Sequence, residues 1–265
     1  MIWDLGCHER EHDMTITAAG ELNSTTDDTT GTISHTTAAF TPPNNSLLVA
    51  HCGIVNGANG GDVRSGMTLS GDGLTWTKRG GPNGDTTSGY TSCHELWTAP
   101  VVTGSSMTLT YSHAGNVGDD KSTALIQVHS FITDGGGSCG FAATPNIIVS
   151  AALGNDGPQT INLPSAAAAS SYKSAGRYYN SNGSDRQASH GTGWTEVYDV
   201  QAAGYGSHQT QVITNDANTD VDWIDIAEGA PATAWFSGGI GIEIEELAAT
   251  IPIMYRRRHI GFHYG

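Results

Sequence analysis

The sequence GDGLTWTKRG, residues 71–80, contains a Gly-Leu-Thr-Trp turn that the chain repeats in altered form as GTGWTEVYDV, residues 191–200. Glycine supplies the backbone angles of a tight turn, and a tryptophan that follows it is large enough to fill the space between two packed sheets. We therefore expect Gly73 and Gly193 to form turns. Trp76 and Trp194 should then be buried at equivalent positions in the middle of two β-sandwiches.

The residues around these turns have the composition of an all-β protein. The chain contains 35 glycines among 265 residues, and no long stretch has the apolar periodicity of an amphipathic helix. Short runs alternate apolar and polar residues instead, as in SMTLTYSH, residues 106–113, and GIGIEIEEL, residues 239–247. This alternation predicts strands with one buried face and one solvated face.

The same order of segments occurs in both halves of the chain, which predicts an internal duplication. The corresponding segments are residues 40–56, 73–80, 93–113 and 122–131 in the first half, and residues 163–180, 191–197, 206–226 and 237–247 in the second. We expect two tandem antiparallel β-sandwiches of the jelly-roll or immunoglobulin-like type. The predicted boundaries are residues 1–135 for the first sandwich, 136–145 for a glycine-rich linker, 146–250 for the second sandwich and 251–265 for a tail.

The chain is strongly acidic, with a net charge of −15. This charge excludes a general affinity for nucleic acid, which requires a basic surface. No segment has the length of a membrane span, and the first residues, MIWDLGCHEREHD, lack the basic and apolar regions of a secretory signal. A mature fragment, an unconventional secretion route or a virus particle released by lysis would each reconcile this start with a composition typical of extracellular proteins.

The four cysteines could form disulfides or serve as small buried side chains in strands. They are Cys7, Cys52, Cys93 and Cys139. The sequence does not choose among the three possible pairings, and we expect buried thiols. Three of the cysteines have a neighbouring histidine, in the pairs Cys7-His8, His51-Cys52 and Cys93-His94. Adjacent residues of a strand point to opposite faces, so each pair can give only one ligand to a structural zinc site.

Two motifs match catalytic signatures without the structural setting that those signatures need. In HEREH, residues 8–12, His8 and His12 could bind zinc from one face of a helix, with Glu9 polarising a water molecule. The strand-like segment DMTITAAG follows at once, so no helix is expected there. GGSCG, residues 136–140, matches the elbow of hydrolases, but no helix is predicted after Ser138. We therefore predict no catalytic residue, no metal and no cofactor.

Acidic loops and tyrosines are the remaining candidates for binding. GNVGDD, residues 115–120, and NTDVDWID, residues 218–225, could hold calcium, but neither has EF-hand spacing, and we expect solvated turns instead. Tyr178, Tyr179 and Tyr205 are expected to be exposed on loops. There they could stack on sugar rings or lie at a protein interface.

Residues 40–131 resemble a β-sandwich module of uncharacterised structural proteins of tailed bacteriophages. The module has a Leu-Leu-Val strand, a Gly-Leu-Thr-Trp turn, a Trp-Thr-Ala-Pro segment and a Thr-Val-Thr strand. This chain has SLLVA, GLTWTKRG, ELWTAPVV and MTLTYS in the same order. The second half keeps only the Gly-x-Gly-Trp-Thr turn and the closing strand. The resemblance implies a virion surface component, such as a capsid decoration protein, a head fibre or a tail-associated adhesin, and it implies no catalytic residue.

The segment IPIMYRRRHIGFHYG, residues 251–265, is basic in an acidic protein and rich in large apolar residues. Its alternation predicts a strand that adds to the edge of a sheet on a neighbouring chain, while a tail folded onto its own sandwich is the alternative. The expected docking residues are Tyr255, Arg256, Arg257, Arg258, Phe262 and Tyr264. Their partners would be other virion proteins and copies of the chain itself.

These observations together predict a non-catalytic virion structural protein, located at the virion surface, that decorates a capsid or forms part of a fibre. One alternative is a carbohydrate-binding adhesin, whose partners would be host-surface glycans. The other is a secreted polysaccharide-active enzyme. Such an enzyme needs a pair of converging carboxylates, and no motif in the sequence nominates one.

Overall fold

The protein is all-β, as the sequence predicts. The computed structural model describes residues 16–30, 34–56, 66–71, 73–85, 91–113, 121–133, 138–142, 144–145, 147–149, 159–168, 170–181, 186–189, 192–201, 207–214, 220–227 and 234–247. Within these ranges it contains seventeen strands and no helix, and every strand pairing is antiparallel.

The first half of the chain forms two sheets and a short additional strand. The strands are β1 (Ile16–Thr30), β2 (Ser34–Thr36), β3 (Ser46–Asn56), β4 (Thr68–Ser70), β5 (Thr77–Asp85), β6 (Thr91–Val101), β7 (Thr110–Ser112), β8 (Lys121–Thr133) and β9 (Ser138–Gly140). The first large sheet has the order β1-β8-β3-β6-β5, and the first small sheet has the order β2-β7-β4. Strand β9 lies within the segment predicted as a linker and pairs with a strand of the second half.

The second half forms two further sheets. Its strands are β10 (Ile147–Val149), β11 (Gln159–Asn162), β12 (Tyr172–Ser181), β13 (Arg186–Ser189), β14 (Thr195–Gln201), β15 (Ser207–Thr214), β16 (Asp220–Ala227) and β17 (Ala234–Leu247). The second large sheet has the order β10-β17-β12-β15-β14, with β9 also paired to β17, and the second small sheet has the order β11-β16-β13. Each order is that of the corresponding first-half sheet with every strand number raised by nine.

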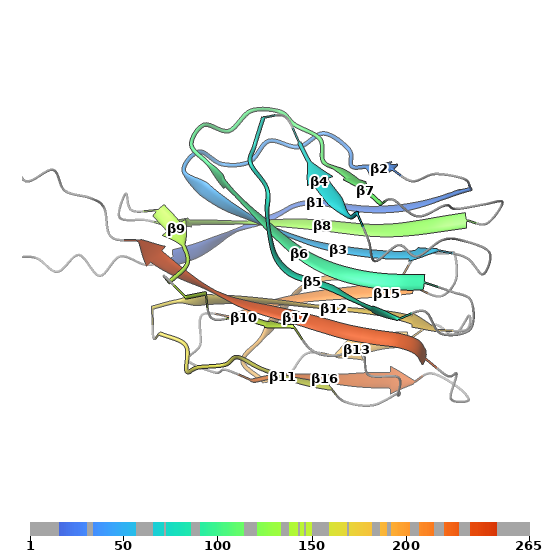
Figure 1. Cartoon of the computed structure of the whole chain (residues 1–265). Helices are drawn as coiled ribbons and strands as arrows, with labels where there is room; N and C mark the ends of the chain where they lie inside the picture. Colours follow the sequence, from blue (N-terminus) through green and yellow to red (C-terminus); the bar gives the residue numbers. More distant parts are fainter. Residues whose placement is uncertain are drawn as a thin grey trace, which may run out of the picture.

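The four sheets are stacked as layers (Figure 1). The first small sheet lies on the first large sheet, the second large sheet comes next, and the second small sheet forms the opposite outer layer. We call the layer of side chains between the two large sheets the seam. The two large sheets therefore each have both faces covered, which explains why their central strands carry buried residues on both sides.

The first core fills the space between the two sheets of the first half. Alternate residues of β3, beginning at Leu48, face this core, and they meet Leu69 of β4 and Tyr111 of β7. The predicted alternation of residues 106–113 is confirmed, because Met107, Leu109 and Tyr111 are buried while the intervening residues are partly exposed.

The seam receives the other face of β3. Leu47, Val49 and Leu96 of the first large sheet pack with residues of the second large sheet that include Ile242 and Ile244 of β17. These side chains form a second apolar core in which strands from both halves of the chain take part. Burial of this apolar surface stabilises the contact between the halves.

The prediction that β17 has one solvated face is wrong. Ile240, Ile242 and Ile244 face the seam, but Glu243 on the opposite face is only 4 % exposed. Its carboxylate accepts a hydrogen bond from the backbone N–H of Ala168 at 2.6 Å. The second small sheet covers this face of the second large sheet, and the sequence pattern of one strand does not reveal that covering layer.

The two glycine–tryptophan turns precede β5 and β14, which occupy the same place in the two strand orders. Gly73 has a φ of 81° and Gly193 a φ of 86°, and both values favour glycine. Trp194 is buried as predicted. The prediction that Trp76 is buried is wrong. This side chain is half-buried and packs against the first core, just before the start of β5 at the edge of its sheet.

Candidate functional site

Several predicted site residues lie outside the described residues. All six predicted docking residues do so, namely Tyr255, Arg256, Arg257, Arg258, Phe262 and Tyr264. The same holds for the HEREH motif with Cys7, for the acidic segment at residues 115–120 and for Tyr205. The predicted docking role of the tail therefore stays a prediction.

The two cysteine–histidine pairs that the structure describes, His51-Cys52 and Cys93-His94, separate across the first large sheet, as expected for neighbours on a strand. Cys52 and Cys93 point into the first core, and His51 and His94 lie on the other face of the same strands. Cys52, Cys93 and Cys139 are buried free thiols, which confirms the expected interpretation for these three. In the described part of the chain, no group of three or more His, Cys, Asp or Glu side chains is arranged to hold a metal ion.

Three histidines, which we call the seam histidines, lie together in the seam. They are His51 on β3, His94 on β6 and His129 on β8. His51 Nδ1 lies 3.4 Å from His94 Nε2, and the two rings stack with centroids 5.4 Å apart. His51 Nε2 is 3.2 Å from the Ser174 hydroxyl of β12, so this hydrogen bond joins the two large sheets.

The surroundings of the seam histidines keep them neutral. Burial lowers the pKa of His94 to about 3 and the pKa of His129 to about 4. Burial, followed by the neighbouring histidines, also lowers the pKa of His51 well below its usual value. All three rings are fully or almost fully buried. An enclosed cluster of this kind offers no access to a substrate, so its arrangement is suited to holding the sheets together rather than to catalysis.

A second polar cluster is centred on Glu95, whose side chain is fully buried against the first core. The Trp97 indole N–H donates to one carboxylate oxygen at 2.9 Å, and the Tyr111 hydroxyl donates to the same oxygen at 3.2 Å. Lys78 forms an ion pair with the other oxygen at 3.2 Å. Burial raises the pKa of Glu95, while Lys78 and the hydrogen bonds oppose that rise. The cluster is satisfied within the protein, so it serves the structure of the core.

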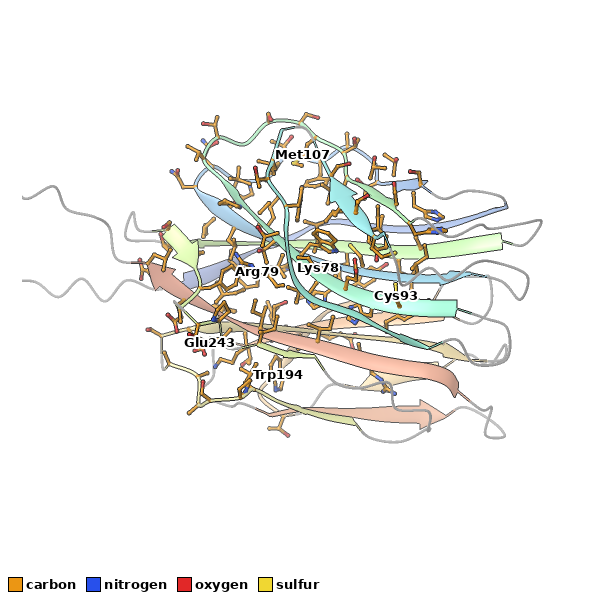
Figure 2. All side chains as sticks on the ribbon, in the orientation of Figure 1. Lys78, Arg79, Cys93, Met107, Trp194 and Glu243 are labelled. Atoms are coloured by element: carbon orange, nitrogen blue, oxygen red, sulfur yellow. The ribbon has the colours of Figure 1, made fainter. Side chains whose placement is uncertain are left out.

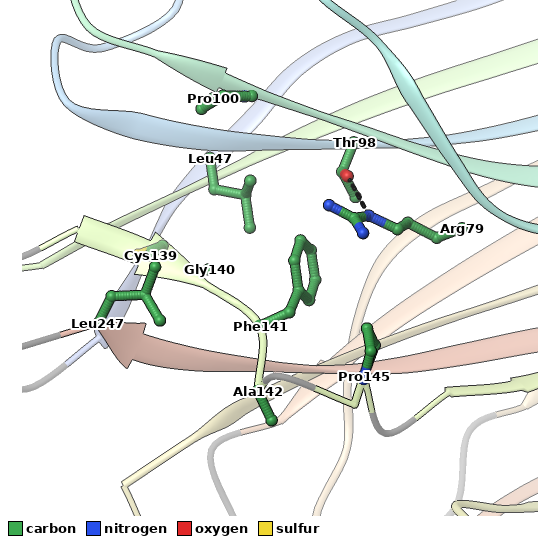
Figure 3. A pocket seen from close by; sticks show the side chains of 10 residues that line it. All are labelled: Leu47, Arg79, Thr98, Pro100, Cys139, Gly140, Phe141, Ala142, Pro145 and Leu247. Atoms are coloured by element: carbon green, nitrogen blue, oxygen red, sulfur yellow. Dashed lines mark hydrogen bonds between the residues drawn. The ribbon is translucent and has the colours of Figure 1, made fainter.

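A pocket of about 430 Å³ opens at the apolar end of the seam (Figure 3). Its apolar walls come from four segments of the chain, namely β3, β6, the segment after β9 and the end of β17. The apolar residues are Leu47, Pro100, Phe141, Ala142, Pro145 and Leu247. Strand β9 forms part of the wall through Cys139 and Gly140, because it pairs there with the end of β17. Burial, with a smaller contribution from Glu246, raises the pKa of the Cys139 thiol to about 12, so this thiol is not a nucleophile at neutral pH.

Arg79 is the charged residue among the described residues that line this pocket. Lys78 and Arg79 are neighbours on β5, and Figure 2 labels both beside this strand. The Arg79 Nε–H donates to the Thr98 hydroxyl at 2.9 Å, and the guanidinium carbon lies 4.3 Å from the centre of the Phe141 ring. The guanidinium is thereby fixed in orientation beside the pocket (Figure 3).

Two expectations about exposed binding groups are wrong. Tyr178 is fully buried, because it lies on β12 in the middle of the second large sheet, and its ring centroid is 6.3 Å from that of His94. Tyr179 belongs to the same strand, not to a loop. Most of the predicted acidic loop at residues 218–225 belongs to strand β16, which pairs with β11 and β13 on its two sides.

Ser138 starts strand β9, and no helix follows it among the described residues.

The sequence interpretation did not identify Arg79 or Phe141 as site residues. Both lie in segments whose partners come from distant parts of the chain, so their proximity depends on the stacking of the two large sheets. The sequence contained one signal that could have identified Arg79. The chain has only eleven lysines and arginines, and Arg79 comes three residues after Trp76, at the start of the strand that follows the glycine–tryptophan turn.

Comparisons with known proteins do not supply a family or a function. No protein-family model, no curated protein and no solved structure matches the chain. Within the described ranges, no helix is long and apolar enough to cross a lipid bilayer.

Proposed function

We propose that this chain is a non-catalytic structural protein of a bacteriophage virion, which decorates the capsid or forms part of a surface fibre. The proposal rests on the order of four motifs in residues 40–131, which resembles that of phage structural modules. An architectural role is supported by the described polar clusters, because the Glu95 cluster and the seam histidines are enclosed between sheets rather than arranged around an open cleft.

We also propose that the two halves arose by duplication of one sandwich. The observation that carries this proposal is the strand order, since eight strands of the first half correspond one by one to eight strands of the second. The sequence segments that prompted the hypothesis fall on corresponding strands; for example, residues 40–56 contain β3 and residues 163–180 contain most of β12. On this view, residues 1–135 and 146–250 are the two repeats, and residues 136–145 connect them.

The shared apolar core in the seam makes the two halves of the chain a single rigid body. Two repeats that share one apolar core behave as a single stiff unit, whereas tandem domains joined only by a linker can move independently. A stiff unit presents its ends at a fixed spacing, which suits a component of a regular particle. The basic segment at residues 251–265 would then attach this unit to an acidic surface of the particle or of a second copy.

Association with particles tests this proposal. Particles assembled from the genome that encodes the chain should carry the full-length protein through a density gradient at a constant copy number, as measured by quantitative mass spectrometry. A variant that ends at residue 250 should fold, as judged by circular dichroism, but should remain in the soluble fraction. Full-length protein that never sediments with particles contradicts the virion assignment, and equal occupancy by the truncated variant contradicts the docking role.

A further inference from the structure

The guanidinium of Arg79 is well placed to bind a ligand. Its Nε–H donates to Thr98, and its face is covered by Phe141. Among the described residues, no acceptor is hydrogen-bonded to its two terminal NH2 groups, which can therefore bind a ligand. In the described part of the chain, no carboxylate lies within ion-pair distance of this guanidinium. An arginine fixed in this way presents two parallel N–H donors, and a carboxylate is the acceptor that matches them in both charge and shape.

The apolar walls of the pocket indicate the chemical nature of the part of the ligand that does not contact Arg79. Leu47, Pro100, Phe141, Pro145 and Leu247 offer apolar surface, and the volume of about 430 Å³ is within the range of small-molecule sites. The lining contains one cation and, among the described residues, no anion. A ligand with an apolar body would bury that body against these walls and place a single negative group beside Arg79.

We propose that this pocket, at the apolar end of the seam, binds a small carboxylic acid with an aromatic or branched apolar body. The carboxylate accepts hydrogen bonds from the terminal nitrogens of Arg79, and the apolar body lies against Phe141, Pro100 and Leu47. The ligand contacts β3, β5 and β6 of the first half and Leu247 at the end of β17 in the second half, so its binding also stabilises the contact between the halves.

The side chains of the residues that follow β17 do not provide such a carboxylate. Leu247 lines the pocket, and residues 248–265 continue from it. This segment contains no aspartate or glutamate, and it carries Arg256, Arg257 and Arg258. A basic segment is not complementary to a pocket whose one charged lining residue is an arginine, so the occupant we infer is a separate molecule.

Calorimetric titration of the full-length protein with 3-phenylpropionate tests the proposal, with 3-phenylpropan-1-ol as the neutral analogue of the same shape. We expect saturable binding of the acid with a dissociation constant below about 1 mM. The alcohol, which lacks the charge, should bind at least about tenfold more weakly. Equal binding of the two compounds overturns the proposal, as does the absence of acid binding up to about 10 mM.

Three variants identify the site. Arg79→Gln removes the charge and should weaken binding of the acid about tenfold or more. Arg186→Gln removes one positive charge from β13 in the second small sheet and should leave the affinity unchanged. Ala142→Trp keeps Arg79 but fills the pocket, so it should abolish binding even if Arg79→Gln does not fold. Unchanged affinity in a folded Arg79→Gln protein, or in Ala142→Trp, overturns the proposal.

Discussion

Replacement of Gly176 by alanine is expected to disrupt the seam. Gly176 lies on β12 in the second large sheet, directly opposite His51 of the first large sheet. An added Cβ atom would lie 2.2 Å from His51 Nδ1, 2.7 Å from Cε1 and 2.8 Å from Cγ. Ordinary contacts of this kind are about 3.5–4.0 Å, so the imidazole ring must move by roughly 1 Å or the two sheets must separate.

The net cost follows from two opposing effects. Alanine in a strand is favoured over glycine by roughly 0.5–1 kcal/mol, because it restricts the unfolded chain. Overpacking of a closed core costs typically about 1–3 kcal/mol. Movement of the ring also weakens the contacts of His51 with His94 and Ser174, worth roughly 0.5–1.5 kcal/mol for each hydrogen bond. We therefore expect a net destabilisation of about 1–4 kcal/mol.

Urea unfolding at neutral pH measures this change, with the slope of the transition as a check that the unfolding remains two-state. The matched control is a double-mutant cycle with His51→Ala, which removes the ring that the new methyl group would strike. The double variant should be more stable than the sum of the two single changes predicts, by about 1 kcal/mol or more. A Gly176→Ala protein as stable as the wild type, or a cycle without coupling, would refute the packing of the seam described above.

Three further predictions concern the buried polar and aromatic groups. Below pH 6.5 the seam histidines are protonated in the unfolded chain but stay neutral in the folded chain, because burial lowers their pKa. The free energy of unfolding is therefore highest above pH 6.5 and falls as the pH approaches about 4, the pKa of His129 in the folded protein. Unfolding measured from pH 6.5 to pH 4 should therefore lose up to about 1.4 kcal/mol per pH unit through this residue, and a His129→Asn variant should lack that part of the slope. Glu95→Ala should destabilise the protein by about 2–5 kcal/mol, because it leaves two buried donors, the Trp97 indole N–H and the Tyr111 hydroxyl, without their acceptor, and Glu95→Gln should cost less in the same urea assay. Trp194→Ala should cost about 3–5 kcal/mol and Trp76→Ala clearly less, since only Trp194 is fully enclosed; equal losses in melting temperature would contradict this difference.

The elements of the fold could be predicted from local sequence, because strand formation depends on short alternating patterns and on turn residues. The alternation at residues 106–113 and the glycines at positions 73 and 193 are examples, and both correspond to features of the structure. These signals depend only on neighbours along the chain.

The stacking of the sheets could not be predicted in the same way. Glu243 and Tyr178 look solvent-facing in the sequence, yet both are buried because a second layer covers their side of the sheet. The pocket beside Arg79 depends on contacts between β5, β9 and the end of β17, which are distant in the sequence. No pattern within a single strand encodes which face a second sheet will cover.

Cryo-electron microscopy of particles that carry the protein is the most direct test of the central claim. A virion structural protein should appear as ordered density at a symmetric position on the particle surface, with both halves of the chain in one four-layered body. Density for two sandwiches in variable relative orientations would contradict the rigid seam. Particles without any density for the protein, although it is abundant in the same lysate, would contradict the structural role itself.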